Sequence, residues 1–113
     1  MTKKELSPFD KQLLQRIAED HEFAKAFFEE LLERPLPVQL GFLRRMRGVS
    51  QEVLAGQLQV DQSYVSKLER EGSDHLLSIY EKLGKFLRAR LAFVPIGARI
   101  VWPKGRSPLQ NAA

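Results

Sequence analysis

Cysteine is absent from the 113-residue chain, and its absence removes several classes of function together. Disulfide scaffolds, thiolate metal sites, iron–sulfur clusters and cysteine nucleophiles are all excluded. Histidine is scarce as well: His21 and His75 are far apart in the sequence and have no neighbouring ligand residues, so neither is expected to bind a metal or to act in catalysis. With no cofactor and no metal expected, the composition favours a binding protein over an enzyme.

Long hydrophobic runs are also missing. No apolar stretch approaches the roughly 20 residues that cross a bilayer, and the polar N-terminal residues predict that there is no signal peptide. Hydrophobic residues make up 43% of the chain, which is enough for one modest core. We therefore expect a soluble, cytoplasmic protein of about one domain with no membrane contact.

Acidic residues are almost missing from the C-terminal third. Residues 76–113 carry seven Lys or Arg and a single acidic residue, Glu81, whereas residues 1–37 have a net charge of −2 and residues 38–75 are neutral. The formal net charge of +4 is therefore unevenly distributed. A basic balance alone is weak evidence for a nucleic-acid partner. The basic third either touches flanking phosphates or faces an acidic partner.

Prolines, glycines and capping residues divide the chain into helices. An N-terminal helical extension is expected over residues 1–37, beginning at Ser7-Pro8 and ending before the two prolines Pro35 and Pro37. Its second helix has three phenylalanines at helical spacing. These are expected in the core, with a partner groove as the alternative; they are Phe23, Phe27 and Phe28.

Residues 38–88 are expected to form a helix-turn-helix domain with helices near 38–47, 51–58, 62–70 and 76–87. After residue 88 the hydrophobic period changes to strand-like alternation, which predicts a β-hairpin over 89–103 with strands at 90–94 and 99–102. Trp102 either anchors the hairpin to the core or contacts a dimer partner. Residues 104–113 are expected to be disordered. The predicted fold class is therefore mainly α: a helix-turn-helix bundle with an N-terminal extension and a short C-terminal hairpin.

The segment 50–70, SQEVLAGQLQVDQSYVSKLER, carries the functional pattern. Ala55 is small where a second helix must cross closely. The apolar contacts between the two helices are expected from Leu54, Leu58, Val65 and Leu68. The exposed face of the second helix carries Gln62, Ser63, Ser66 and Lys67. These hydrogen-bonding groups suit base edges in a major groove, where Gln pairs with adenine and Lys reaches guanine.

Residues 39–70 resemble the helix-turn-helix of lambda-type repressors and Cro, the Xre family. The resemblance is carried by the run YVSKLER at 64–70 and by Gln51, Ala55, Val65 and Leu68. It implies a lambda-repressor-like bundle in which Gln51 holds a phosphate and Arg44 pairs with Glu69. The family usually has glycine in the turn, where this chain has Gln59. A non-glycine residue there costs about 1 kcal/mol if the conformation is kept, so we expect a slightly remodelled turn.

Three arginines precede the motif and are expected to contact phosphates, with a solvated face as the alternative. They are Arg44, Arg45 and Arg47. Tyr64 is grouped with these backbone contacts, although packing against the first helix of the motif is an equal alternative.

A wider resemblance covers about residues 20–94. The segments DHEFAKAF at 20–27 and GSDHLLSI at 72–79, followed by a helix and a strand at 90–94, resemble HigA-like antitoxins of toxin–antitoxin modules. The resemblance implies an autoregulating repressor that binds a RelE-type toxin. We expect a homodimer that reads a palindromic operator in double-stranded DNA, because one short helix reads only a few base pairs. A phage-type repressor and a protein-interaction module without a toxin remain alternatives.

Overall fold

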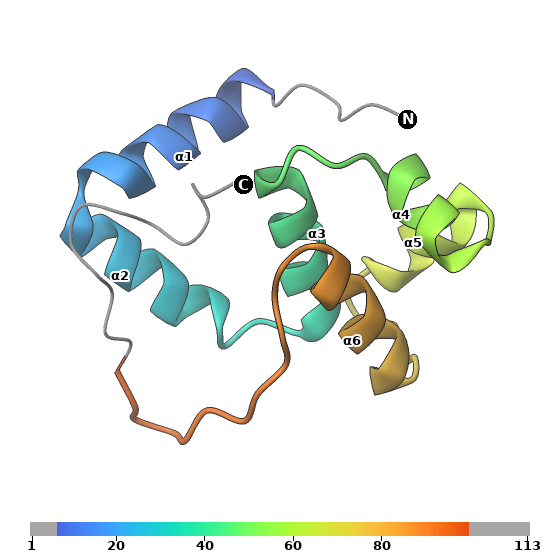
Figure 1. Cartoon of the computed structure of the whole chain (residues 1–113). Coiled ribbons are helices and arrows are strands. Elements are labelled where there is room, and N and C mark those ends of the chain that lie inside the picture. Colours follow the sequence, from blue (N-terminus) through green and yellow to red (C-terminus); the bar gives the residue numbers. More distant parts are fainter. Residues whose placement is uncertain (1–6, 100–113) are drawn as a thin grey trace.

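The computed structural model describes residues 7–99, and in that range the chain forms six α-helices and no β-strand (Figure 1). The helices are α1 (Pro8–Glu19), α2 (His21–Leu31), α3 (Leu36–Met46), α4 (Gln51–Leu58), α5 (Gln62–Leu68) and α6 (Leu77–Phe86). The mainly helical architecture predicted from the sequence is confirmed. None of these helices has the length and apolar character needed to cross a membrane; the longest has 12 residues.

Short polar side chains fix where three of the helices begin. At the start of α1, Ser7 accepts a hydrogen bond from the Asp10 amide at 3.1 Å. Asp20 accepts one from the Phe23 amide of α2 at 3.0 Å, and Ser50 accepts one from the Val53 amide of α4 at 3.1 Å. Each cap satisfies one of the amides that lack a partner in the first turn. Asp61 precedes α5, but its side chain makes no capping hydrogen bond.

Helix α3 is packed on two sides, and each side has its own core cluster. One cluster joins α3 to α4, α5 and α6, and its members are aliphatic apart from Tyr80; they are Leu40, Val49, Leu54, Ala55, Val65, Leu68, Tyr80, Leu83 and Leu87. The other cluster joins α3 to α1 and α2 and contains Ile17, Ala24, Phe42 and Met46. The three phenylalanines of α2 pack against this second cluster, as the core interpretation predicted. The N-terminal helices therefore rest directly on α3.

The segment after α6 has no regular secondary structure up to residue 99. The first predicted strand, 90–94, is not a strand among the described residues. Most of the second, 99–102, lies outside them, together with Trp102 and the predicted disordered tail 104–113. An isolated two-stranded hairpin is marginal in water, and the hairpin stays a prediction. In Figure 1 the segment leaves α6 and turns back toward α2, where Arg99 lies 3.9 Å from Glu29.

Candidate nucleic-acid interface

Helices α4 and α5 are joined by a tight turn in which Gln59 adopts a left-handed conformation, with φ 60° and ψ 46°. The Val60 amide donates to the Ala55 carbonyl at 3.1 Å and closes the end of α4. The expectation of a remodelled turn is therefore wrong, because the left-handed geometry is kept with a glutamine in place of glycine. The fully buried Val65 and Leu68 of α5 hold the two helices together, which offsets the strain at Gln59.

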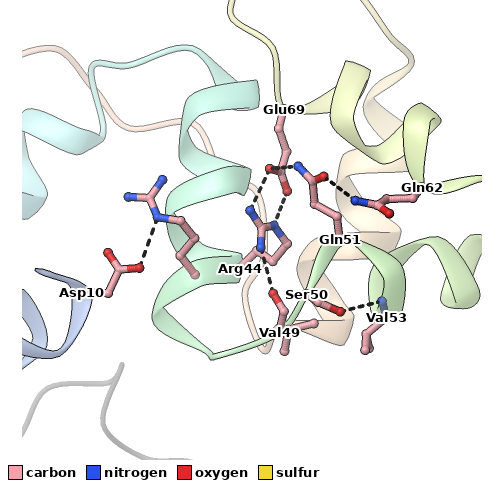
Figure 2. Close-up of polar contacts among 9 residues, drawn as sticks. Asp10, Arg44, Val49, Ser50, Gln51, Val53, Gln62 and Glu69 are labelled. Atoms are coloured by element: carbon pink, nitrogen blue, oxygen red, sulfur yellow. Dashed lines mark hydrogen bonds and ion pairs between the residues drawn. The ribbon is translucent and has the colours of Figure 1, made fainter. Parts of the chain in front are cut away.

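An ion pair between α3 and the end of α5 fixes the position of α5. The Arg44 Nε donates to Glu69 Oε2 at 2.6 Å and its Nη2 donates to Glu69 Oε1 at 3.1 Å (Figure 2). The side chains are 14% and 9% exposed, and a forked pair of this kind is strongly directional. Arg44 also donates to the Val49 carbonyl at 2.9 Å. The ion pair that the resemblance implied is therefore present, and it is largely shielded from solvent.

Gly41 leaves room for this ion pair. A Cβ atom at position 41 would lie 3.3 Å from Glu69 Oε1, which is tighter than ordinary contact. Gly41 could not be identified from the sequence, because a glycine within a helix gives no sign of which side chain approaches it. Its role follows from the packing of α5 against α3.

Two glutamines extend the ion pair to the surface. Gln51 Nε2 donates to Glu69 Oε1 at 3.0 Å, and Gln62 Nε2 donates to Gln51 Oε1 at 3.2 Å (Figure 2). We call Arg44, Glu69, Gln51 and Gln62 the polar network. Because Gln51 begins α4 and Gln62 begins α5, the network links α3 to the first residue of both helices of the motif.

The side chains predicted to read bases share one side of α5. Gln62, Ser63 and Lys67 are exposed, and Ser66 is half-buried. The helical repeat of 3.6 residues places these four positions opposite Val65 and Leu68. The side of α5 away from the core therefore presents only amide, hydroxyl and ammonium groups over this stretch.

The three arginines predicted to contact phosphates each have a partner within the chain. Arg44 belongs to the polar network, and Arg45 Nε lies 3.6 Å from Asp10 Oδ2 on α1. Arg47 Nε donates to the Leu87 carbonyl at 2.9 Å. Burial, and secondly the charge of Arg88, lower the pKa of the Arg47 guanidinium. The Arg45 side chain is 47% exposed, compared with 14% for Arg44.

Tyr64 is half-buried rather than presented to solvent. Its ring packs against the cluster around Leu54 and meets the His75 ring edge-on, with centroids 5.7 Å apart. This arrangement matches the packing alternative for Tyr64, and it places His75 against an aromatic ring.

In the described part of the chain, no group of three or more His, Asp or Glu side chains is placed to hold a metal ion. Comparison of the chain with protein-family models, with curated proteins and with solved structures gave no match. The arrangement of α3, α4 and α5 is therefore the observation that bears on function.

Proposed function

We propose that the protein is a sequence-specific DNA-binding transcriptional repressor in which α5 enters the major groove of an operator. The observation that carries the proposal is the polar network, which runs from the shielded Arg44–Glu69 pair to Gln62 on the exposed side of α5. An exposed amide held by two successive hydrogen bonds has lost much of its rotational freedom before it meets a ligand. Preorganisation of this kind suits recognition of a fixed pattern of donors and acceptors.

The four polar side chains of α5 take different roles in this proposal. Gln62 pairs with adenine and Lys67 reaches guanine, because these side chains match the groove edges of those bases. Ser63 is exposed and contacts either a base or a phosphate, whereas the half-buried Ser66 contacts bases only at close approach. In this proposal α3, α4, α5 and α6 correspond to the helices of the lambda-repressor-like bundle that the resemblance implies.

Phosphate binding is assigned differently from the sequence-based expectation. Gln51 contacts a phosphate from the N-terminus of α4, where backbone amides favour an anion, and Arg45 contributes its half-exposed guanidinium. Arg44 and Arg47 act as positioning residues, because their guanidinium groups are bonded to Glu69 and to the Leu87 carbonyl. Affinity then falls steeply as salt increases, with a slope that reflects few phosphate contacts.

The test is selection from a library of randomised duplexes, followed by titration of the enriched sequence with two matched variants. Lys67→Ala removes a charge from α5, and Lys82→Ala removes the same charge from the exposed side of α6. We expect Lys67→Ala to relax preference at one base position by about 5- to 150-fold, corresponding to about 1–3 kcal/mol. Lys82→Ala keeps the preference. If no sequence is enriched, or if both variants lose preference equally, DNA reading by α5 is wrong.

A finer form of the proposal is an autoregulating antitoxin in the cytoplasm that acts as a homodimer on a palindrome and binds a RelE-type toxin. It is supported by the resemblance of residues 20–27 and 72–79 to HigA-like antitoxins. Co-expression with the product of the adjacent gene tests it, since an antitoxin restores growth and co-purifies with that product. Growth arrest without rescue, or no toxic neighbour, favours the phage-type repressor or the interaction module.

A further inference from the structure

Residues 89–97, which we call the arm, carry large apolar side chains into solvent. Phe93 and Ile96 are fully exposed and Val94 is 48% exposed. Within residues 7–99, no hydrogen bond joins residues 90–94 to another residue. Single apolar side chains on a surface are ordinary, but two fully exposed ones only three positions apart on an irregular segment indicate a surface that is covered in the functional assembly.

An apolar groove lies beside the start of the arm. It encloses about 130 Å³ between α2, α3 and α6, at the junction of the two core clusters. Its lining includes Phe28, Leu31, Leu40, Phe42, Leu43 and Tyr80. The arm of the same chain forms part of the rim with Leu91 and then leaves it, so that Phe93, two residues further, makes no contact there.

We propose that the arm of one copy covers this groove on a second copy, and that the exchange is reciprocal. Each Phe93 then occupies its partner's groove, and Ile96 packs beside it. A two-fold exchange satisfies both arms and both grooves with one contact repeated twice, as in most homodimers.

Charge favours a second copy as the occupant. The stretch 88–99 contains Arg88, Arg90 and Arg99 and no acidic residue, whereas the end of α2 and the following turn carry Glu29, Glu30 and Glu33. Within one copy, Arg99 reaches Glu29 only at 3.9 Å and is 78% exposed. A basic arm and an acidic helix end on the same chain attract each other between copies.

Glu29 has unused capacity for such a contact. Its Oε2 atom is buried and has no hydrogen-bond partner among the described residues. Arg90 is exposed and forms no ion pair within residues 7–99. Residues 94–99 of the same chain lie beside Glu29 and Glu33, so guanidinium groups of a second copy reach this oxygen when that segment moves aside.

The area is modest for a dimer. A buried aromatic side chain contributes about 150–250 Å², so with Ile96 and Val94 each arm buries about 400 Å² of its own surface. The two arms together contribute about 800 Å², and the total reaches the usual range for stable complexes only if the two grooves contribute a similar area. We therefore expect a dimer that dissociates on dilution. The inference rests on the proposed function in one respect, which is that a repressor reading a palindrome needs two copies. The arm contact itself does not require DNA.

Sedimentation equilibrium of the full chain without DNA tests the exchange, with the double variant Phe93→Ser/Ile96→Ser. Both side chains are fully exposed in one copy, so the circular dichroism spectrum stays unchanged while the dimer dissociation constant rises at least about tenfold, as for central interface residues. The matched control is Phe9→Ser, since Phe9 is 69% exposed on α1. A chain that is monomeric at every concentration overturns the inference, and so does a dimer that the double variant leaves intact.

Disulfide trapping places the contact, because the natural chain has no cysteine. We mix copies that carry Phe93→Cys with copies that carry Gln39→Cys, a position on the groove lining, and oxidise the mixture. A cross-link between the two species is expected. Lys67→Cys in place of Gln39→Cys is the control and stays unlinked. Equal linking to both positions overturns the exchange, as does an arm that binds anionic vesicles or another protein while the chain remains monomeric.

The sedimentation and selection experiments together separate this inference from the proposed function. A wild-type chain that is monomeric at every concentration but still selects one half-site from randomised DNA refutes arm exchange and leaves DNA reading standing. A dimer that selects no sequence refutes DNA reading and leaves arm exchange standing.

Discussion

The two sides of α3 are held by different kinds of interaction. On the side of α4, α5 and α6, an aliphatic cluster is accompanied by the shielded Arg44–Glu69 pair. On the side of α1 and α2, aromatic rings provide the contact: the Phe27 and Phe42 centroids are 5.0 Å apart, and the ion pair of Asp10 with Arg45 has a half-exposed guanidinium.

The difference teaches which side of α3 sets the position of α5. Apolar packing is non-directional and tolerates small shifts, whereas forked hydrogen bonds weaken steeply with angle. The polar network therefore fixes where α5 stands relative to α3. The aromatic side anchors the N-terminal helices, and it pairs one group of the candidate interface, Arg45, which lies 3.6 Å from Asp10.

The largest expected effect lies on the aromatic side. Phe42→Ala removes a ring that is 6% exposed and contacts the rings of Phe27 and Phe28. We expect the free energy of unfolding to fall by about 3–5 kcal/mol, measured by urea denaturation. Phe9→Ala, at an exposed position on α1, is the control and changes stability by less than about 0.5 kcal/mol. Similar losses in both variants contradict an aromatic core on this side.

A slightly smaller loss is expected from Glu69→Ala, which leaves the Arg44 charge shielded and unpaired. We expect the free energy of unfolding to fall by about 3 kcal/mol. This is the lower end of the range for breaking a buried ion pair, because some solvent reaches both groups. Thermal unfolding measures it, with the exposed Glu71→Ala as control. The double variant Arg44→Met/Glu69→Leu recovers much of the stability but not DNA selectivity. If stability and selectivity recover together, the network does not position α5.

The ion pair on the other side of α3 is expected to contribute less. Asp10→Asn removes the charge facing Arg45, whose side chain is 47% exposed, and we expect a loss of at most about 1 kcal/mol that shrinks in salt. Glu22→Gln, exposed on α2, is the control. A loss in urea denaturation equal to that of Glu69→Ala removes the distinction between the two sides.

The smallest effect is expected at the turn of the candidate interface. Gln59→Gly relieves the left-handed strain at φ 60° but makes the unfolded chain more flexible, so we expect a net gain of about 0.5 kcal/mol. Gln57→Gly, at an exposed position within α4, is the matched control and costs about 1 kcal/mol because helix propensity falls. A higher melting temperature for Gln59→Gly and a lower one for Gln57→Gly support the geometry of the turn. A lower melting temperature in both variants contradicts it.

The sequence by itself determined the features that depend on near neighbours. Ser7 and Ser50 cap helices because each acts on an amide three residues away, and hydrophobic spacing placed Val65 and Leu68 inside. The partners of Arg44 and Arg45 show the limit of prediction from sequence. The resemblance predicted Glu69 as the partner of Arg44, but nothing predicted Asp10 as the partner of Arg45, because no local pattern links α1 to α3.

Only the tertiary structure decided which polar groups meet. Arg47 reaches the Leu87 carbonyl 40 positions away, and Gln51 joins Gln62 to Glu69. These contacts depend on how α5 and α6 pack against α3, which a pattern along the chain does not encode. The sequence identified α5 as the candidate DNA-reading helix, and the packing of α3 between two cores decided which polar side chains are exposed and which are bonded within the chain.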